Sequence, residues 1–397
     1  MSDLIETFRD ATMLQCEFIE KLLDLDRSEI SSFAETIVSF LKRTEENRYV
    51  YGLAAGRSAL SLYSFLQLLQ NHFENVFPWI QEDPLQRHFR REKNNLAIAI
   101  SGSGETPSVN YYIENVINQD CMVKLITANE NGTAYRLVED YEKGSILVIK
   151  GRTKYNTDVG RTSRLSPLGT EFELEVLAFL NAVFSEIQAS FGGINDRSCD
   201  QYRLTVQDFA DNGKMIARMD PDHLNRWFGK LFPRSGRYVI GGVGRSGLVA
   251  RAFEMRITHL NKNSFWERNY NAPCFQIGDV YIPISGSGNN YEILAGTASA
   301  LGKGADVLPI TANRSSKLVS MMQKVNRHDD IIFIPVKEKY MEMFERNSGT
   351  TSWLLSEFTK HRYPIFEINS CIFTNSVIAA GAEFLGILES GMRRLHS

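Results

Sequence analysis

The chain has 397 residues, 43% of them hydrophobic, which is enough to bury two cores of ordinary size. Its 44 basic and 47 acidic residues are interspersed and give a formal net charge of −3, so the electrostatics of the whole chain give no argument for binding to nucleic acid or an anionic membrane. The one basic cluster, residues 87–91, is followed by Glu92 and is expected to be a solvated loop.

The predicted elements of the first half begin with a helical pattern over residues 4–42. Four short apolar runs then predict buried strands at residues 49–53, 96–100, 123–126 and 145–148. Helical patterns fill the gaps, at residues 58–73, 107–119 and 171–188. Alternation of this kind is typical of βαβ units around a parallel sheet with helices on both faces.

The second half repeats this order. A helical lead-in at residues 206–231 precedes four apolar runs, at residues 238–240, 280–284, 307–310 and 331–334. Between the halves, residues 191–196 have the composition of a linker. We therefore predict an α/β protein with two Rossmann-like domains, residues 1–195 and 196–397, and a boundary near residue 195.

The two halves also share short motifs. Residues 100–104, Ile-Ser-Gly-Ser-Gly, recur at 284–288, and residues 126–129, Ile-Thr-Ala-Asn, recur at 310–313, both with an offset of 184. Upstream, the Gly-Arg-Ser turn of residues 56–58 recurs at 244–246 with an offset of 188. A period this long exceeds that of solenoid repeats, so we infer two domains of one fold, duplicated and fused.

Both repeated glycine-serine motifs are expected at the carboxyl ends of parallel strands, where ligands of open α/β sheets bind. Glycine lets the backbone approach an anion closely, and a helix that begins there favours negative charge. Serine hydroxyl groups add further donors. The pattern predicts a phosphate cradle in each half, with these candidate ligands: Ser58, Ser101, Ser103 and Gly104 in the first, and Ser246, Ser285 and Ser287 in the second.

A dinucleotide site is a rival interpretation. Residues 242–247 fit GxGxxG after a predicted strand, and Glu267 follows 20 residues later, as a dinucleotide-binding fold requires. The matching turn in the first half, residues 54–59, breaks the pattern. A dinucleotide would also leave the Ser-Gly-Ser-Gly loops unexplained, so we favour the phosphate cradle.

At these motifs the chain resembles the sugar isomerase (SIS) fold and, more narrowly, 6-phospho-3-hexuloisomerase. Residues 100–106 match the phosphate loop of that family, and residues 151–154 and 167–173 match a later segment. Residues 244–260, in the second half, match the remaining stretch. The resemblance covers about residues 40–190 and 205–395. The family enzyme is usually a single-domain chain that self-associates, whereas this chain is a fusion.

The resemblance implies an isomerase that interconverts a 3-hexulose 6-phosphate and fructose 6-phosphate through an enediol. Such a reaction requires a group that removes a proton from carbon and a group that moves protons between oxygens. By resemblance, Glu173 is the base, His259 is the shuttle or polarising acid, and Thr106 completes the phosphate loop. Weaker candidates for substrate contact are Arg57, Arg152, Lys154 and Arg245. No metal or other cofactor is expected.

Aligning the halves predicts that only one site is complete. His259 falls opposite Asn71, and a loose alignment places Thr374 opposite Glu173. The second loop reads Asn289-Asn290 where the first reads Glu105-Thr106, so its terminal threonine is absent. Because many SIS enzymes assemble a site from two subunits, we expect an intrachain pseudo-dimer in which Glu173 of one half faces His259 of the other.

Simpler roles remain open for these residues. Glu173 would also suit a helix start for its interaction with the helix dipole, and His259 would suit a packed helix. An alternative function is a non-catalytic sugar-phosphate-binding regulator made of tandem SIS domains. A third keeps the fold but changes the chemistry, to aldose–ketose isomerisation or removal of an amine from a sugar phosphate.

The remaining expectations concern the cell and its partners. The five cysteines are scattered without CxxC or metal spacing, which favours free thiols in a reducing compartment. We expect no apolar run near the roughly 20 residues of a spanning helix, and the first four residues do not open a signal peptide. The predictions are a cytoplasmic protein, a small-molecule sugar phosphate as partner, and no nucleic acid or membrane. An apolar helix face would still allow a homodimer.

Overall fold

The computed structural model describes residues 2–43, 48–74, 76–81, 95–157, 159–192, 199–233, 236–338 and 364–394. The chain divides into two compact units. The first, here the N-unit, consists of Glu17–Thr157 and Gly169–Asp208; the second, the C-unit, consists of Met1–Cys16, Asp158–Leu168 and Phe209–Ser397. Neither unit is one continuous segment. The predicted boundary near residue 195 and the basic cluster at residues 87–91 lie outside the described residues, and the division at 195 stays a prediction.

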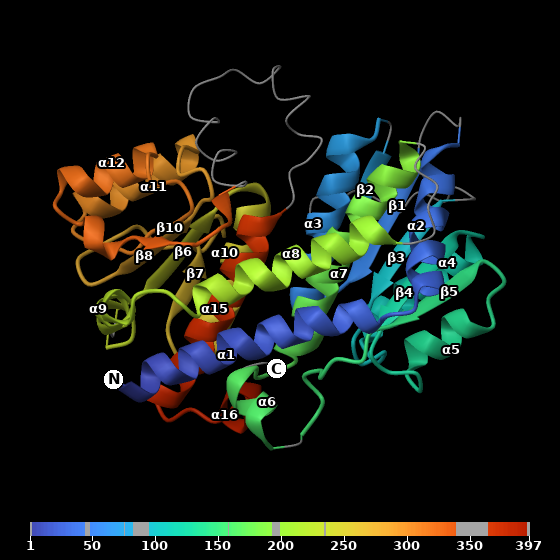
Figure 1. Ribbon diagram of the computed structural model, residues 1–397, viewed down its shortest axis with the longest axis horizontal. Helices are drawn as coiled ribbons and strands as arrows, with labels where there is room; N and C mark the ends of the chain where they lie inside the picture. The colour runs from blue at the N-terminus through green and yellow to red at the C-terminus, as the bar shows by residue number, and fades with distance from the viewer. Residues whose placement is uncertain are drawn as a thin grey trace. The chain divides into compact units, whose positions relative to one another are not determined.

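The N-unit contains a five-stranded sheet in the order β2-β1-β3-β4-β5, with every neighbouring pair parallel (Figure 1). Its strands are β1 (Arg48–Ala54), β2 (Val76–Ile80), β3 (Leu96–Ile100), β4 (Met122–Thr127) and β5 (Gly144–Val148). The four strands predicted for this half are confirmed. Strand β2 was not predicted, because Pro78 interrupts its pattern; proline is tolerated there since β2 is an edge strand.

Helices cover both faces of this sheet. They are α2 (Arg27–Leu41), α3 (Gly56–His72), α4 (Pro107–Asn118), α5 (Thr133–Glu139) and α7 (Thr170–Phe191). Alternate strand residues, such as Tyr51 and Leu53, form one core with α4 and α5. On the other face, Lys124 of β4 donates to the carbonyl of Ser32 on α2 at 3.2 Å. Helix α7 packs against α2 and α3.

The C-unit sheet has the order β11-β10-β8-β6-β7, with β9 also pairing β8, and again every pair is parallel. Its strands are β6 (Tyr238–Gly242), β7 (Ser264–Trp266), β8 (Val280–Ile284), β9 (Asp306–Val307), β10 (Ile310–Thr311) and β11 (Ile332–Phe333). The predicted strand at 307–310 is therefore two short strands on either side of Pro309. The short strand β7 was not predicted. Because the strand order matches that of the N-unit, the predicted duplication of an α/β fold is confirmed.

The C-unit helices are α6 (Arg161–Leu165), α9 (Pro221–Leu231), α10 (Gly244–His259), α11 (Tyr291–Gly302), α12 (Lys317–Lys324), α15 (Ile365–Phe384) and α16 (Glu389–Arg394). Helices α1 (Ser2–Lys21) and α8 (Asp200–Ile216) each have residues in both units. The predicted helical lead-ins are broken: a 3₁₀ turn, η1 (Leu22–Asp24), separates α1 from α2, and α8 ends before α9 begins.

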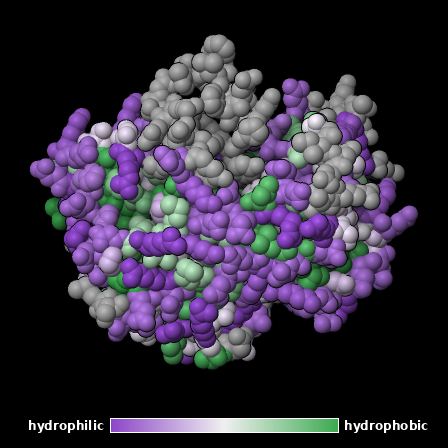
Figure 2. All heavy atoms as spheres, viewed as in Figure 1, coloured by the Kyte–Doolittle hydropathy of each residue, from purple (hydrophilic) through white to green (hydrophobic). Residues whose placement is uncertain are grey.

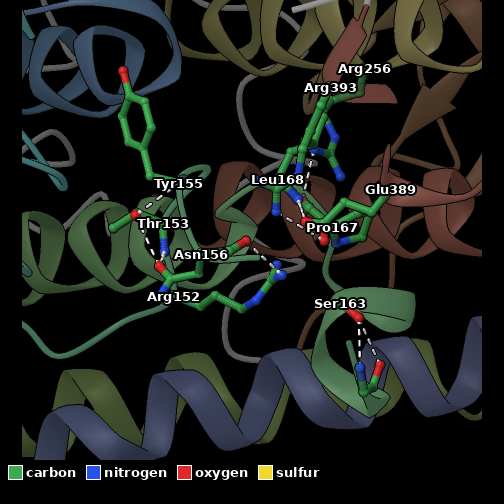
Figure 3. A network of polar contacts seen from close by, with 11 residues as sticks. Arg152, Thr153, Tyr155, Asn156, Ser163, Pro167, Leu168, Arg256, Glu389 and Arg393 are labelled. Carbon is green, nitrogen blue, oxygen red and sulfur yellow. Dashed lines mark hydrogen bonds and ion pairs between the residues drawn. The ribbon is translucent and has the colours of Figure 1, made fainter. Parts of the chain in front are cut away.

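The chain on both sides of α6 is held by hydrogen bonds inside the C-unit (Figure 3). Arg256, which is 1% exposed, donates to the carbonyl of Pro167 at 3.0 Å, and Glu389 accepts from the amide of Leu168 at 2.7 Å. At the start of α6, the Ser163 hydroxyl and the backbone of Gly160 bond reciprocally. These contacts fix the end of the segment that precedes α7.

The expectation that no apolar stretch would be long enough to span a membrane was wrong. Helices α7 and α15 both have the length and apolar composition of a spanning helix. However, 78% of the most apolar window of α7 and 89% of that of α15 are buried within the protein, as in the core helices of soluble α/β proteins. The face shown in Figure 2 is largely hydrophilic, with small hydrophobic areas between. All five cysteines are free of disulfide bonds, as predicted.

Candidate functional site

The loop at residues 101–106 joins β3 to α4 in the N-unit and is built on the end of β4. The Thr127 hydroxyl donates to the carbonyl of Ser101 at 2.8 Å, and the Asn129 side chain donates to the carbonyl of Ser103 at 2.8 Å. Gly104 has φ of 71°, a conformation that favours glycine. The repeated Ile-Thr-Ala-Asn motif therefore supports the repeated Ser-Gly-Ser-Gly motif.

This loop leaves polar groups available to a ligand. Ser101 is 3% exposed, and its hydroxyl oxygen has no hydrogen-bond partner among the described residues. Thr106 stands at the N-cap of α4 without making a side-chain cap. A buried hydroxyl usually has a hydrogen-bond partner. One without such a partner, close to the start of a helix, therefore indicates a candidate ligand position.

The acidic residue of this loop is directed elsewhere. The Glu105 carboxylate accepts from the amide of Thr133 at 2.9 Å and from its hydroxyl at 2.8 Å, at the start of α5. These hydrogen bonds lower the pKa of Glu105. A negative charge next to an anion site is thus tied to a neighbouring helix.

A second predicted turn carries an ion pair. After Gly56, with φ of 61°, Arg57 and Ser58 begin α3. Arg57 Nε lies 2.6 Å from Glu173 Oε2, and Arg57 Nη1 donates to Thr170 at 3.3 Å. Burial lowers the pKa of Arg57, and the charge of Glu173 opposes that shift. The carboxylate is the more accessible partner: the Glu173 side chain is 22% exposed, that of Arg57 only 7%.

Helix α7, which bears Glu173, packs against the serine-glycine loop through Phe172. A Cβ atom built on Gly102 would lie 2.7 Å from the ring of Phe172, the residue that precedes Glu173. In the N-unit, Arg57 at the start of α3 pairs with Glu173, and the residue before Glu173 packs on the loop at 101–106; a shared binding site for these residues stays a prediction. A carboxylate oriented by a guanidinium, on a helix that packs against a loop with an unpartnered hydroxyl, is suited to moving a proton on a bound anion.

Replacing Gly102 with alanine tests this close approach. We expect the kcat/KM of a reaction that uses Glu173 to fall by roughly 10²-fold, because the added methyl group would displace Phe172 and with it Glu173. Overpacking should also lower the free energy of unfolding by about 1–3 kcal/mol. The control is Gly229→Ala on α9, whose Cβ would meet nothing within 4 Å and which should raise stability by roughly 0.5–1 kcal/mol. Unchanged activity in Gly102→Ala would show that the approach has no role.

Two of the weaker predicted contacts, Arg152 and Lys154, lie in the loop after β5, where Figure 3 shows Arg152. Arg152 is buried; its amide donates to Glu171 at 3.1 Å, and its guanidinium donates to the carbonyl of Asn156 at 3.1 Å. Lys154 is exposed, with Nζ 5.1 Å from the centre of the Tyr155 ring. Arg152 thus helps to order its own loop, and a substrate contact for either residue stays a prediction.

The C-unit repeats this scaffold in detail. Thr311 donates to the carbonyl of Gly286 at 3.3 Å, and Asn313 donates to the carbonyl of Ser287 at 3.2 Å. Gly288, with φ of 61°, takes the position of Gly104. Arg245 and Ser246 begin α10 as Arg57 and Ser58 begin α3. The predicted second cradle, including Ser285, therefore has the backbone of the first.

The expectation that the second half has lost its carboxylate was wrong. Thr374, the residue aligned with Glu173, is buried on α15 and donates to the carbonyl of Ser370 at 2.8 Å. Glu367, near the start of α15, takes the place of Glu173: it lies 3.9 Å from Arg245 and accepts from Ser246 at 3.4 Å. The sequence did not show this because the two halves differ in spacing before their last helix, so a constant offset missed the pair.

The predicted histidine lies on α10 in the C-unit. His259 is 4% exposed and occupies the last turn of that helix. In the N-unit the aligned residue Asn71 is exposed at the end of α3, and the neighbouring His72 contacts the carbonyl of Leu68 at 2.9 Å. The role of His259 in proton transfer stays a prediction.

The rival dinucleotide motif has a structural explanation. Glu267 accepts a hydrogen bond of 2.8 Å from the hydroxyl of Tyr281, and burial raises the pKa of Glu267. A Cβ atom on Gly247 would lie 2.8 Å from the carbonyl of Gly242, so these glycines let α10 pack on β6. Glu267 is thus engaged in the C-unit interior. Among the described residues, no three His, Cys, Asp or Glu side chains gather as a metal site would require.

Comparison with known proteins gives several relatives named 3-hexulose-6-phosphate isomerase. The chain is 29% identical over 167 residues to a 3-hexulose-6-phosphate isomerase of Methylomonas aminofaciens, an alignment that covers 42% of this chain and 82% of the relative. It is 26% identical over 146 residues to the protein of that name from Mycobacterium gastri, covering 37% and 68%. No family model matches the chain.

Solved structures match almost the whole chain. Tagatose-6-phosphate ketose/aldose isomerase from Escherichia coli aligns with a TM-score of 0.62 and 16% identity, covering 98% of this chain and 94% of that one. The C-terminal domain of glucosamine-fructose-6-phosphate aminotransferase from Francisella tularensis aligns with a TM-score of 0.58 and 12% identity, covering 96% of each. The chain therefore has the sugar isomerase (SIS) fold in two copies and resembles the 6-phospho-3-hexuloisomerases in sequence.

Proposed function

We propose that the protein is a phosphosugar isomerase that interconverts a 3-hexulose 6-phosphate and fructose 6-phosphate through an enediol. The observation that carries the proposal is the close approach of Phe172, next to the Arg57-paired Glu173, to Gly102 of the loop that holds the unpartnered hydroxyl of Ser101. The names of the relatives support the substrate class. The proposal includes a cytoplasmic enzyme whose partner is a small sugar phosphate.

The phosphate group would bind at the N-unit loop. Ser101, Ser103 and Thr106 offer hydroxyl donors, and Ser58 adds a hydroxyl at the adjacent helix start; Gly104, whose amide donates to the carbonyl of Ser101, shapes the loop. Such donors hold an anion without a metal, because the amides at the start of a helix carry partial positive charge. Ser246, Ser285 and Ser287 remain candidate ligands of the second cradle.

Glu173 would act as the base. Starting from fructose 6-phosphate, the carboxylate removes the proton on C3, the electron pair forms the C2–C3 double bond, and the carbonyl oxygen on C2 takes up a proton. The resulting 2,3-enediol then loses the proton of the hydroxyl on C3 and gains one at C2, which leaves the carbonyl on C3. No atom is gained or lost. His259 is proposed to move the proton between the oxygens.

Deuterium exchange tests the reaction and its position. The protein is incubated with fructose 6-phosphate in D₂O, and the proton spectrum is followed over time. A 2,3-enediol predicts loss of the C3 proton signal and appearance of a 3-ketose, whereas aldose–ketose isomerisation predicts exchange at C1. His259→Asn should slow exchange, and full activity in that variant would remove His259 from the mechanism. Binding of fructose 6-phosphate without exchange would instead identify a regulator.

A further inference from the structure

The two phosphate loops have the same backbone but differ at the residue that begins the following helix. Thr106, the N-cap of α4, makes no side-chain cap. Asn290 stands 184 residues later as the N-cap of α11, and its side-chain oxygen accepts from the amides of Glu292 at 3.0 Å and Ile293 at 3.3 Å. Those amides correspond in register to Ser108 and Val109 of the N-unit. In the C-unit, a side chain of the protein thus occupies the donors that begin the helix.

The first serine of each loop also differs between the units, in the hydrogen bonding of its hydroxyl oxygen. Ser101 is 3% exposed and its hydroxyl oxygen has no partner among the residues described for the N-unit. The hydroxyl oxygen of Ser285 instead accepts from the amide of Gly288 at 3.2 Å. An anion at the second loop would have to displace the Asn290 side chain from the amides of Glu292 and Ile293 and would forfeit those hydrogen bonds, whereas Ser285 still has its hydroxyl proton to donate. At the first loop an anion would meet donors that the protein leaves unused.

We propose that Asn290 is a built-in ligand of the second loop, and that the choice between Thr106 and Asn290 confines phosphate binding to the N-unit. This inference rests on the proposed function for the identity of the phosphate ligand. It assigns to Asn290 a role that its position as a helix cap alone would not require: exclusion of a phosphorylated sugar from the C-unit. The chain then binds one phosphate, although it carries two loops of one design.

Exchange of the two residues tests the proposal. Thr106→Asn supplies the N-unit loop with the cap found in the C-unit. We expect its affinity for fructose 6-phosphate to fall at least tenfold, while its melting temperature stays equal to or above that of the wild type, since asparagine caps helices well. Loss of affinity with undiminished stability separates occupation of the site from damage to the fold. Glu114→Gln, at an exposed position on the same helix, is the control and should retain both properties.

The reciprocal variant is Asn290→Thr. Isothermal titration with fructose 6-phosphate and, separately, with inorganic phosphate should give one site per chain for the wild type and a second, weaker site for Asn290→Thr. Two sites in the wild type, or unchanged affinity in Thr106→Asn, would overturn the inference. So would a single site in a folded Asn290→Thr variant.

The outcome for the proposed isomerase is read separately. If the wild type binds one inorganic phosphate but exchanges no proton of fructose 6-phosphate, the isomerase proposal fails and the inference about Asn290 stands. If the wild type exchanges the C3 proton but binds two phosphates, the isomerase proposal stands and the inference fails.

Discussion

Glu173→Gln is expected to lower kcat for isomerisation of fructose 6-phosphate by roughly 10²–10⁴-fold, the usual contribution of a positioned general base. Glutamine keeps the shape of the side chain but cannot accept the proton from carbon. The change also removes the negative partner of Arg57, which is 2.6 Å away and buried. We therefore expect a modest loss of stability as well, because a buried guanidinium is left without its carboxylate.

The measurement that isolates the catalytic effect is the rate of C3 deuterium exchange at saturating substrate, together with KM. Because the proposed phosphate donors lie on another loop, KM should change far less than kcat. Glu114→Gln, at an exposed position on α4, is the matched control and should be as active as the wild type. A Glu173→Gln variant that retains the wild-type exchange rate would remove Glu173 from the mechanism.

Glu175→Gln is expected to stabilise the protein at alkaline pH and to leave it unchanged in acid. Glu175 is 2% exposed on α7, and one of its carboxyl oxygens has no hydrogen-bond partner in the described part of the chain. Burial, and secondarily the charge of Glu171, raises the pKa of Glu175 from 4.5 to about 8, while Lys21 opposes the shift. Between pH 4.5 and about 8, Glu175 is therefore protonated in the folded protein and ionised in the unfolded chain.

The sign of the effect follows from that difference. Between pH 4.5 and about 8 the folded state binds more protons than the unfolded state, so the free energy of unfolding falls as the pH rises. Glutamine resembles the protonated carboxyl group and does not titrate. The gain in Glu175→Gln should thus be small near pH 4.5 and reach on the order of 4 kcal/mol by about pH 8.

Urea unfolding of both proteins across this pH range measures the gain. Glu114→Gln again serves as the control, since an exposed carboxyl group should give no such pH-dependent difference. A gain that is the same at all pH values, or a Glu175→Gln variant that is less stable at pH 8, would contradict the assigned protonation state.

Local chain chemistry was sufficient to predict much of the fold. Apolar runs marked every strand with a continuous pattern, and the repeated serine-glycine turns showed that the fold occurs twice. Strand β2 was missed because Pro78 breaks the pattern, and β7 because three residues give too little periodicity. The expectation of no long apolar stretch was wrong for α7 and α15. Their length and composition alone do not distinguish a buried core helix from a spanning one.

The sequence by itself determined the duplication, the parallel α/β architecture and the position of Ser101 and Glu173 as candidate site residues, because these depend on patterns within short segments. Only the tertiary structure decided which distant residues meet. The pairing of Glu367 with Arg245 depends on where α15 begins in space. Chain spacing does not fix such contacts, since insertions between elements change residue offsets without moving the packed helices.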